Sequence, residues 1–193
     1  MSVLANDLSE ADQNEAALSV KEAQLSMMRR LGADEDDLLA VQTNLAVTYR
    51  RLERYEEALS MRQEVYSGRL RLNGEEHQST LIAANNYAHS LAGLQRFEEA
   101  KGLLLKLMPV ARRVFEESND LTLRIRTIYA ALLFMDPAAT LDDHREAVTT
   151  LEEIERIARR VFGGAHPLTA WIEESLREAR AALRARETPS GSA

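Results

Sequence analysis

The residue types that most often carry catalysis or metal binding are few in this sequence, and they form no recognised catalytic pattern. There are four histidines and no cysteines, which excludes a disulfide framework, a Cys-ligated metal and a Cys nucleophile. His144 follows Asp142 and Asp143, and such a cluster could ligate a metal. No His-Glu-x-x-His pattern accompanies it, however, and an acidic helix start explains it without a metal. We therefore expect no catalytic residue, no metal site and no cofactor.

Two other candidate ligand-binding patterns are incomplete. The acidic run Asp34–Asp37 lacks the central Gly and the closing Glu of a calcium-binding EF-hand loop, so we interpret it as the start of a helix. Gly163 and Gly164 form an isolated glycine pair. The phosphate-binding patterns G-x-G-x-x-G and G-x-x-x-x-G-K are absent from the chain, so we do not interpret this pair as a phosphate-binding loop. What remains to be sought is a binding surface rather than a reactive centre.

Composition and charge narrow the class of protein and of partner. The 193 residues contain 8 Gly and 4 Pro, too few turn formers for an all-β fold. The net charge is −7, which disfavours nucleic acid because its binding depends on Lys and Arg neutralising phosphates. No apolar run approaches the roughly 20 residues that a membrane-spanning helix needs, and no secretion signal is evident. We expect a cytoplasmic protein that binds neither nucleic acid nor membrane.

The sequence repeats itself with a period of 42 residues. Leu52–Ala58 (Leu-Glu-Arg-Tyr-Glu-Glu-Ala) matches Leu94–Ala100 (Leu-Gln-Arg-Phe-Glu-Glu-Ala). A Glu-Ala pair marks the same register in steps of 42, 42 and 47, at Glu15-Ala16, Glu57-Ala58, Glu99-Ala100 and Glu146-Ala147. His77 and His166 share one repeat position, which favours a role at the start of a helix over catalysis. A fixed period of this length is typical of stacked helical repeats.

Each repeat predicts two helices joined by a short polar turn. In the first repeat, apolar residues at i, i+1, i+4 and i+7 from Leu45 form a stripe of helical period, and we expect this helix over residues 39–52. The second helix of each repeat begins near Tyr55, Phe97 or Asp142 and ends near a glycine that can cap it. The longer last step adds residues that we place in a longer loop between helices, around residues 135–141.

These units resemble the tetratricopeptide repeat, in the 42-residue form of kinesin light chains. The first repeat has Asn44–Tyr49 (Asn-Leu-Ala-Val-Thr-Tyr) and Arg54–Ala58 (Arg-Tyr-Glu-Glu-Ala), the second has Asn85–Ala88 and Arg96–Ala100, and His166–Thr169 opens the last helix. The resemblance covers roughly residues 12–185 and implies an all-α, right-handed α-solenoid of helix–turn–helix repeats. The third repeat departs from the pattern at Ile128, where the other two have Asn.

The repeat register divides the chain into six parts. We assign a capping half repeat (1–36), tetratricopeptide units one (37–77), two (78–119) and three (120–165, with the longer inter-helix loop), a C-terminal capping helix (166–187) and a disordered tail (188–193). The half repeat is a second helix over residues 12–31, and Val3–Leu8 is a candidate remnant of its own first helix. Either an unpaired helix caps the start, or the chain is excised from a longer array.

In a helical solenoid the first helices line the concave side, and this is where we expect a binding groove. Its face carries Ala40, Thr43, Asn44, Val47 and Arg51 in unit one, Ile82, Asn85, Asn86, His89 and Gly93 in unit two, and Arg124, Thr127, Ile128, Ala131 and Met135 in unit three. Asn is unfavourable within a helix, and its amide both donates and accepts hydrogen bonds. Asn44, Asn85 and Asn86 could therefore hold an extended peptide backbone, the role that the resemblance also implies. We include Thr43 in this site, and Arg51, His89, Arg124 and Thr127 would tune its specificity.

We therefore expect a non-enzymatic scaffold that binds a peptide segment of a partner protein in this groove. Two alternatives remain open. The chain could be a structural module that self-associates end to end through its open repeat ends, or it could be an accessory repeat domain of a larger signalling or enzymatic protein.

Overall fold

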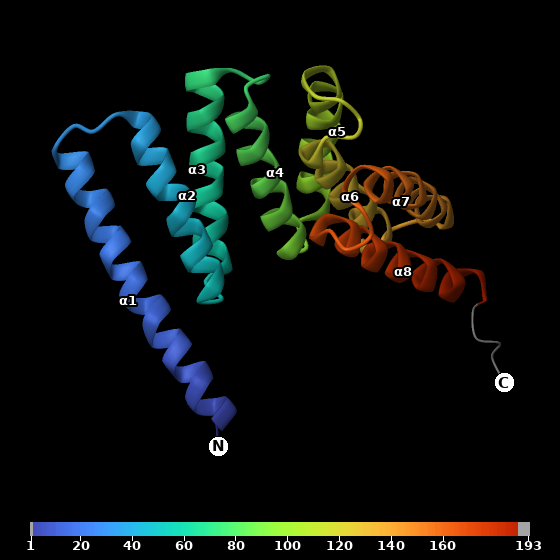
Figure 1. Cartoon of the computed structure of the whole chain (residues 1–193), viewed down its shortest axis with the longest axis horizontal. Coiled ribbons are helices and arrows are strands. Elements are labelled where there is room, and N and C mark those ends of the chain that lie inside the picture. The colour runs from blue at the N-terminus through green and yellow to red at the C-terminus, as the bar shows by residue number, and fades with distance from the viewer. Residues whose placement is uncertain (1, 189–193) are drawn as a thin grey trace. The chain divides into compact units, whose positions relative to one another are not determined.

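The computed structural model describes residues 2–188, with the side chains of α1 described from residue 13 onward. All regular elements of this part of the chain are helices (Figure 1): α1 (Ser2–Arg30), α2 (Glu35–Arg51), α3 (Tyr55–Asn73), α4 (Gln78–Gly93), α5 (Phe97–Val114), α6 (Asp120–Met135), α7 (Leu141–Phe162) and α8 (Pro167–Glu187). The all-α class expected from the sequence is confirmed. The chain divides into two compact units, Met1–Ser90 and Leu91–Ala193, and each is described by itself.

The turns within the first two helix pairs follow the repeat register. The helices α3 and α5 begin at Tyr55 and Phe97, as predicted. Glu53 and Gln95 precede them at equivalent positions, and both have a φ of 58°, the left-handed conformation that reverses the chain in a tight turn. Gly74, with a φ of 80°, follows the last residue of α3, where the missing side chain makes this conformation accessible.

Two helices differ from the expectation at their starts. The helix expected over residues 39–52 begins at Glu35, because Glu35, Asp36 and Asp37 provide an acidic first turn that favours the N-terminal end of the helix dipole. The interpretation of Asp34–Asp37 as a helix start is thereby confirmed. The helix α1 is continuous from Ser2 to Arg30, so Val3–Leu8 belongs to the same helix as the residues that follow and is no separate first helix.

The turn between α6 and α7 spans residues 136–140, two residues more than the turns that precede α3 and α5. The side chain of Thr140 accepts a hydrogen bond from the Asp143 backbone N–H at 3.1 Å, and the Asp143 carboxylate accepts one from the Thr140 backbone N–H at 2.7 Å. This capping box fixes the start of α7. The predicted disordered tail (188–193) lies outside the described residues, apart from Thr188.

In unit 1, α2 packs against α1 and against α3 (Figure 1). Leu18 and Leu25 of α1 are buried in one cluster with Leu45 and Tyr49 of α2. The helices α2 and α3 approach closely at Gly68, where a Cβ atom would lie 2.7 Å from the side chain of Leu39. These contacts fix the relative positions of α2 and α3, two of the three helices that line the site described below.

In unit 2, α6 packs against α5, α7 and α8. The side chains of Leu123, Leu151, Ile154 and Ile172 are fully buried in one cluster, and burying a side chain of this size contributes about 1.5–3 kcal/mol. Trp171 of α8 packs against the same cluster. The last helix is therefore held to the third predicted repeat by a continuous apolar core.

Within residues 2–188, none of the helices has both the length and the apolar character that crossing a bilayer requires. Among the side chains that the structure describes, from residue 13 to residue 188, there is no group of three or more His, Asp and Glu that could hold a metal ion. His144 is buried, and its Nδ1 atom lies 2.8 Å from the Thr140 carbonyl oxygen in a hydrogen bond. The acidic residues before His144 thus serve the start of α7.

Candidate functional site

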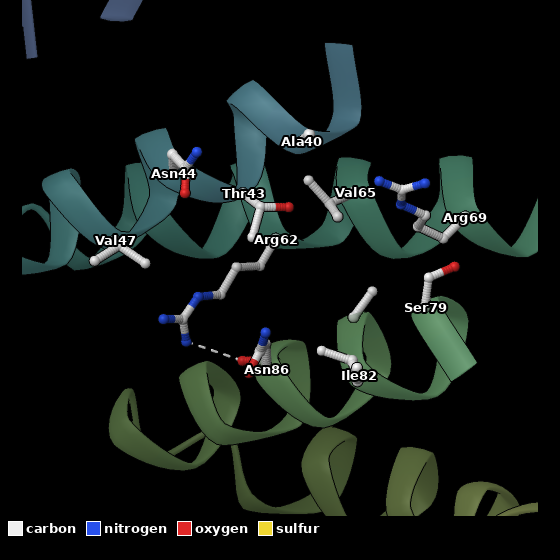
Figure 2. Close-up of a pocket in the computed structure, with 11 residues that line it drawn as sticks. Ala40, Thr43, Asn44, Val47, Arg62, Val65, Arg69, Ser79, Ile82 and Asn86 are labelled. Atoms are coloured by element: carbon white, nitrogen blue, oxygen red, sulfur yellow. Dashed lines mark hydrogen bonds between the residues drawn. The ribbon is translucent and has the colours of Figure 1, made fainter. Parts of the chain in front are cut away.

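Unit 1 contains a groove of about 410 Å³ that is lined by α2, α3 and α4 (Figure 2). The helices α2 and α4 contribute Ala40, Thr43, Asn44, Val47, Ser79, Ile82, Ala83 and Asn86, and α3 contributes Arg62, Val65 and Arg69. Six of these residues lie on the face predicted from the repeat: Ala40, Thr43, Asn44, Val47, Ile82 and Asn86. The sequence pattern therefore identifies two sides of the groove.

The amides of Asn44 and Asn86 lie on opposite sides of the groove, on α2 and α4 (Figure 2). Asn44 is exposed and Asn86 is half-buried. Among the described residues, neither side-chain amide has a hydrogen-bond partner, although the backbone carbonyl of each accepts a bond. Each amide can therefore donate and accept hydrogen bonds to a bound chain.

Arg62 brings a positive charge to the groove from α3. One terminal nitrogen of its guanidinium donates to the Asn86 carbonyl oxygen at 2.9 Å and to the Ser90 hydroxyl at 2.6 Å. In the described part of the chain no carboxylate forms an ion pair with it. Desolvation and the nearby charge of Arg50 lower the pKa of Arg62, which indicates an environment that disfavours a cation. An anionic group in the groove would relieve this cost.

Arg69 is the second arginine of the groove, and its charge is already compensated. Its guanidinium forms an ion pair with the carboxylate of Asp36 and donates to the Asp36 backbone oxygen at 3.3 Å. Thr43 is likewise engaged, since its hydroxyl donates to the Leu39 carbonyl oxygen at 2.8 Å. Among the described groove residues, the two side-chain amides therefore lack hydrogen-bond partners, and the guanidinium of Arg62 is hydrogen-bonded but has no counter-charge.

His89 and Arg51 are exposed but do not line the groove. Desolvation by surrounding protein atoms, together with the charges of Arg62 and Arg50, lowers the pKa of His89. His89 is therefore neutral at pH 7, because the ordinary pKa of histidine is already about 6.5. It is coupled electrostatically to Arg62 without contacting the space that a ligand would occupy.

Three of the predicted site residues lie elsewhere. Asn85 is 8% exposed, and its side-chain oxygen has no hydrogen-bond partner among the described residues. Thr127, in unit 2, is fully buried and donates its hydroxyl to the Leu123 carbonyl oxygen at 2.8 Å, so it is not accessible to a peptide. Arg124 is half-exposed and pairs with Asp120 of the same helix at 2.6 Å. Thr127 is thus inaccessible in this structure, whereas ligand contacts by Asn85 and Arg124 stay predictions.

The sequence reasoning missed Arg62, Val65 and Arg69, because it sought the groove on first helices alone, and it also missed Ser79 and Ala83 on α4. The repeat register contains a pattern that could have identified the two arginines. The positions equivalent to Arg62 are Leu104 and Leu151, and those equivalent to Arg69 are Ala111 and Ala158. All four are fully buried. Charged residues at two core positions of one repeat indicate that the core there opens to solvent.

The comparisons with known proteins agree with this architecture. Residues 38–79 match the family model of the tetratricopeptide repeat, and no curated protein is significantly similar in sequence. A variant of a kinesin light chain from Podosopora anserina with nearly identical TPR-like repeats has a TM-score of 0.74 and 20% identity, over 95% of this chain and 85% of that chain. A second crystal structure of that Podosopora anserina protein has a TM-score of 0.68 and 18% sequence identity. This match covers 98% of the present chain and 94% of that chain.

A third similar structure is BtubC (BKLC) from P. vanneervenii, with a TM-score of 0.61 and 18% identity over all of this chain and 81% of that chain. At these identities the likeness concerns the fold, and it extends over nearly the whole chain. Together with the repeat motifs, these matches confirm the resemblance derived from the sequence. The chain contains a tetratricopeptide repeat at residues 38–79 and has the all-α solenoid fold of kinesin-light-chain-like repeat proteins.

Proposed function

We propose that this protein is a non-enzymatic scaffold that binds a peptide segment of a partner protein in the groove of unit 1. The observation that carries the proposal is the pair of amides of Asn44 and Asn86 on opposite sides of the groove, which lack hydrogen-bond partners among the described residues. The same groove holds Arg62, whose charge has no carboxylate partner among those residues. The tetratricopeptide repeat at residues 38–79 supports the same class of function.

The groove offers three kinds of contact to a peptide. The two amides hydrogen-bond the peptide backbone, which gives affinity independent of the peptide's side chains. Val47, Val65 and Ile82 provide apolar surface for one side chain. Arg62 pairs with an acidic side chain or another anionic group, because its charge lacks a partner within the described residues. The preferred peptide thus carries an apolar residue near an acidic one.

The test begins with selection of binding peptides from a random display library, followed by affinity measurement for the double variant Asn44→Ala/Asn86→Ala. Each amide contributes about 1 kcal/mol through hydrogen bonds, so we expect the double variant to bind at least about tenfold more weakly. The matched control is Asn14→Ala in α1, which makes the same change outside the groove. Unchanged affinity in the double variant would refute the proposal.

A second variant tests the charge of the groove. Arg62→Met keeps most of the side-chain volume and removes the positive charge, so it should weaken acidic peptides and leave the affinity for their amide-substituted versions almost unchanged. Equal losses for both kinds of peptide would show that Arg62 does not recognise an anion.

Cytoplasmic location and the exclusion of nucleic acid and membrane as partners remain predictions from the net charge of −7 and from the sequence pattern. A role as an accessory domain of a larger protein also remains open.

A further inference from the structure

The helix α1 has an apolar face that no described residue of unit 1 covers. One side of α1 packs against α2 through Leu18 and Leu25. On the other side Val20, Met27 and Leu31 are 67%, 54% and 74% exposed. Ala16, which precedes Val20, and Ala23, which lies between Val20 and Met27, are on the same side of the helix and are also exposed. We call these five residues the outer face of α1.

The repeat register shows that this face has the pattern of a core. The residues of α7 equivalent to Ala16, Val20, Ala23 and Met27 are Ala147, Leu151, Ile154 and Ala158. All four are fully buried in the cluster that α7 forms with α6 and α8. The outer face of α1 thus has the spacing and apolar character of a helix surface that packs against another helix, and soluble proteins rarely leave such a surface exposed.

We propose that two copies of this chain associate through the outer face of α1, with the two α1 helices antiparallel and related by a twofold axis. In this arrangement small residues face large ones, because pairing Val20 with Ala23 of the second copy also places Met27 opposite Ala16. Alternation of large and small side chains allows two helices to interdigitate closely. A twofold axis makes each contact occur twice.

Charge complementarity favours a second copy in the antiparallel orientation. Glu15 and Arg30 are exposed at opposite ends of the outer face, and helix geometry places them about 60° apart around the axis, on the same flank. A twofold axis perpendicular to the helices brings like flanks together, so Arg30 of each copy approaches Glu15 of the other. A parallel pair, with its twofold axis along the helices, would instead bring opposite flanks together, so Arg30 of one copy would not meet Glu15 of the other. Ser19 and Ser26 occupy the middle of this flank and are exposed, so no charge opposes close approach there.

The test is the concentration dependence of the molar mass of the full chain, measured by sedimentation equilibrium from about 1 µM to about 1 mM. We expect a reversible monomer–dimer equilibrium that Met27→Glu abolishes. We also expect Arg30→Glu and Glu15→Arg to weaken the dimer about tenfold each, and the double variant to recover the original affinity to within about threefold. Circular dichroism of each variant establishes that its helix content is unchanged.

Arg29→Glu is the matched control, since it makes the same charge change one residue away on the side of α1 opposite the outer face. It should leave the dimer constant unchanged. A chain that stays monomeric at every concentration, or a dimer that Met27→Glu leaves intact, would overturn the proposal. A dimer that Met27→Glu abolishes but whose charge variants do not compensate each other would overturn the antiparallel arrangement. None of these readouts depends on the groove, which lies on other helices of unit 1.

Discussion

Two arginines on α6 provide an internal comparison between a buried and an exposed ion pair. Arg126 is 5% exposed and pairs with Glu117 at 3.2 Å and with Glu153 of α7 at 2.7 Å. Arg124 is 42% exposed, and its one ion pair among the described residues is with Asp120, four residues earlier on the same helix. We predict that Arg126→Ala destabilises unit 2 much more than Arg124→Ala, although the two substitutions remove the same groups from the same helix.

The expected difference follows from burial. Both carboxylates that bind Arg126 are 52% exposed, so each ion pair contributes only about 0.5–1 kcal/mol after allowance for solvent. Truncation to Ala also removes two buried methylene groups, at about 0.8 kcal/mol each. The sum for Arg126→Ala is about 3 kcal/mol, whereas an exposed pair of the Arg124 type contributes about 0.3–0.5 kcal/mol.

The measurement is urea unfolding followed by circular dichroism at 222 nm for both Ala variants and for Arg126→Met. The Met variant retains the apolar stem and loses only the ion pairs, so it should lose about 1–2 kcal/mol. Combining it with Glu153→Gln tests the pair directly, because the losses of two interacting residues do not add. If Arg126→Ala and Arg124→Ala differ by less than about 1 kcal/mol, burial does not control the contribution of these arginines and the reasoning fails.

Two further predictions concern unit 1. The Tyr49 hydroxyl donates a hydrogen bond to Glu22 at 2.7 Å. Burial, together with Glu22, raises the pKa of Tyr49 to about 12. Tyr49→Phe removes this bond and should lower the free energy of unfolding, measured in urea, by about 1 kcal/mol. Because this pKa exceeds that of an unfolded tyrosine, the stabilisation should disappear as the pH rises from about 10 towards 12. The pKa of His89 is lowered by desolvation and by Arg62 and Arg50, so Arg50→Gln should raise it in an NMR titration. The unfolded state binds the His89 proton more readily than the folded state does. The contribution of His89 to stability is therefore present above pH 6.5 and is lost as the pH falls through the lowered pKa of the folded state. An unchanged His89 pKa in the Arg50→Gln variant would contradict the electrostatic coupling between His89 and Arg50.

The repeat register predicts more than the helices, because equivalent positions make equivalent contacts. The amide nitrogen of Gln42 donates to Glu64 at 2.7 Å between α2 and α3. Arg126 and Glu153 occupy the same two repeat positions and make the same kind of bond between α6 and α7. A polar pair that links the two helices of a repeat could thus be predicted from the sequence once the register is known, since helix spacing alone places both residues on facing sides.

The packing of α1 could not be predicted in the same way. Its Glu15-Ala16 pair follows the second-helix pattern, which in α7 directs the equivalent alanine into the core. In α1 the opposite side, with Leu18 and Leu25, is buried instead. Both sides of α1 are apolar, so local sequence does not decide which one packs against α2. The choice depends on which neighbouring helices are present, and this is a property of the whole unit.

Arg62 shows why stability and binding should conflict in the groove. Its equivalents Leu104 and Leu151 are fully buried apolar residues, so Arg62→Leu restores the side-chain type of the other repeats. Ser90 is half-buried, so its hydroxyl can still reach solvent when Arg62 is replaced, and removal of the guanidinium ends its repulsion with Arg50. We therefore predict that Arg62→Leu unfolds at the same or a higher urea concentration than the original protein, by up to about 1 kcal/mol, while it loses affinity for acidic peptides. A variant that is destabilised by more than about 1 kcal/mol would show that Arg62 is a structural residue of unit 1, and its place in the groove would then need no ligand to explain it.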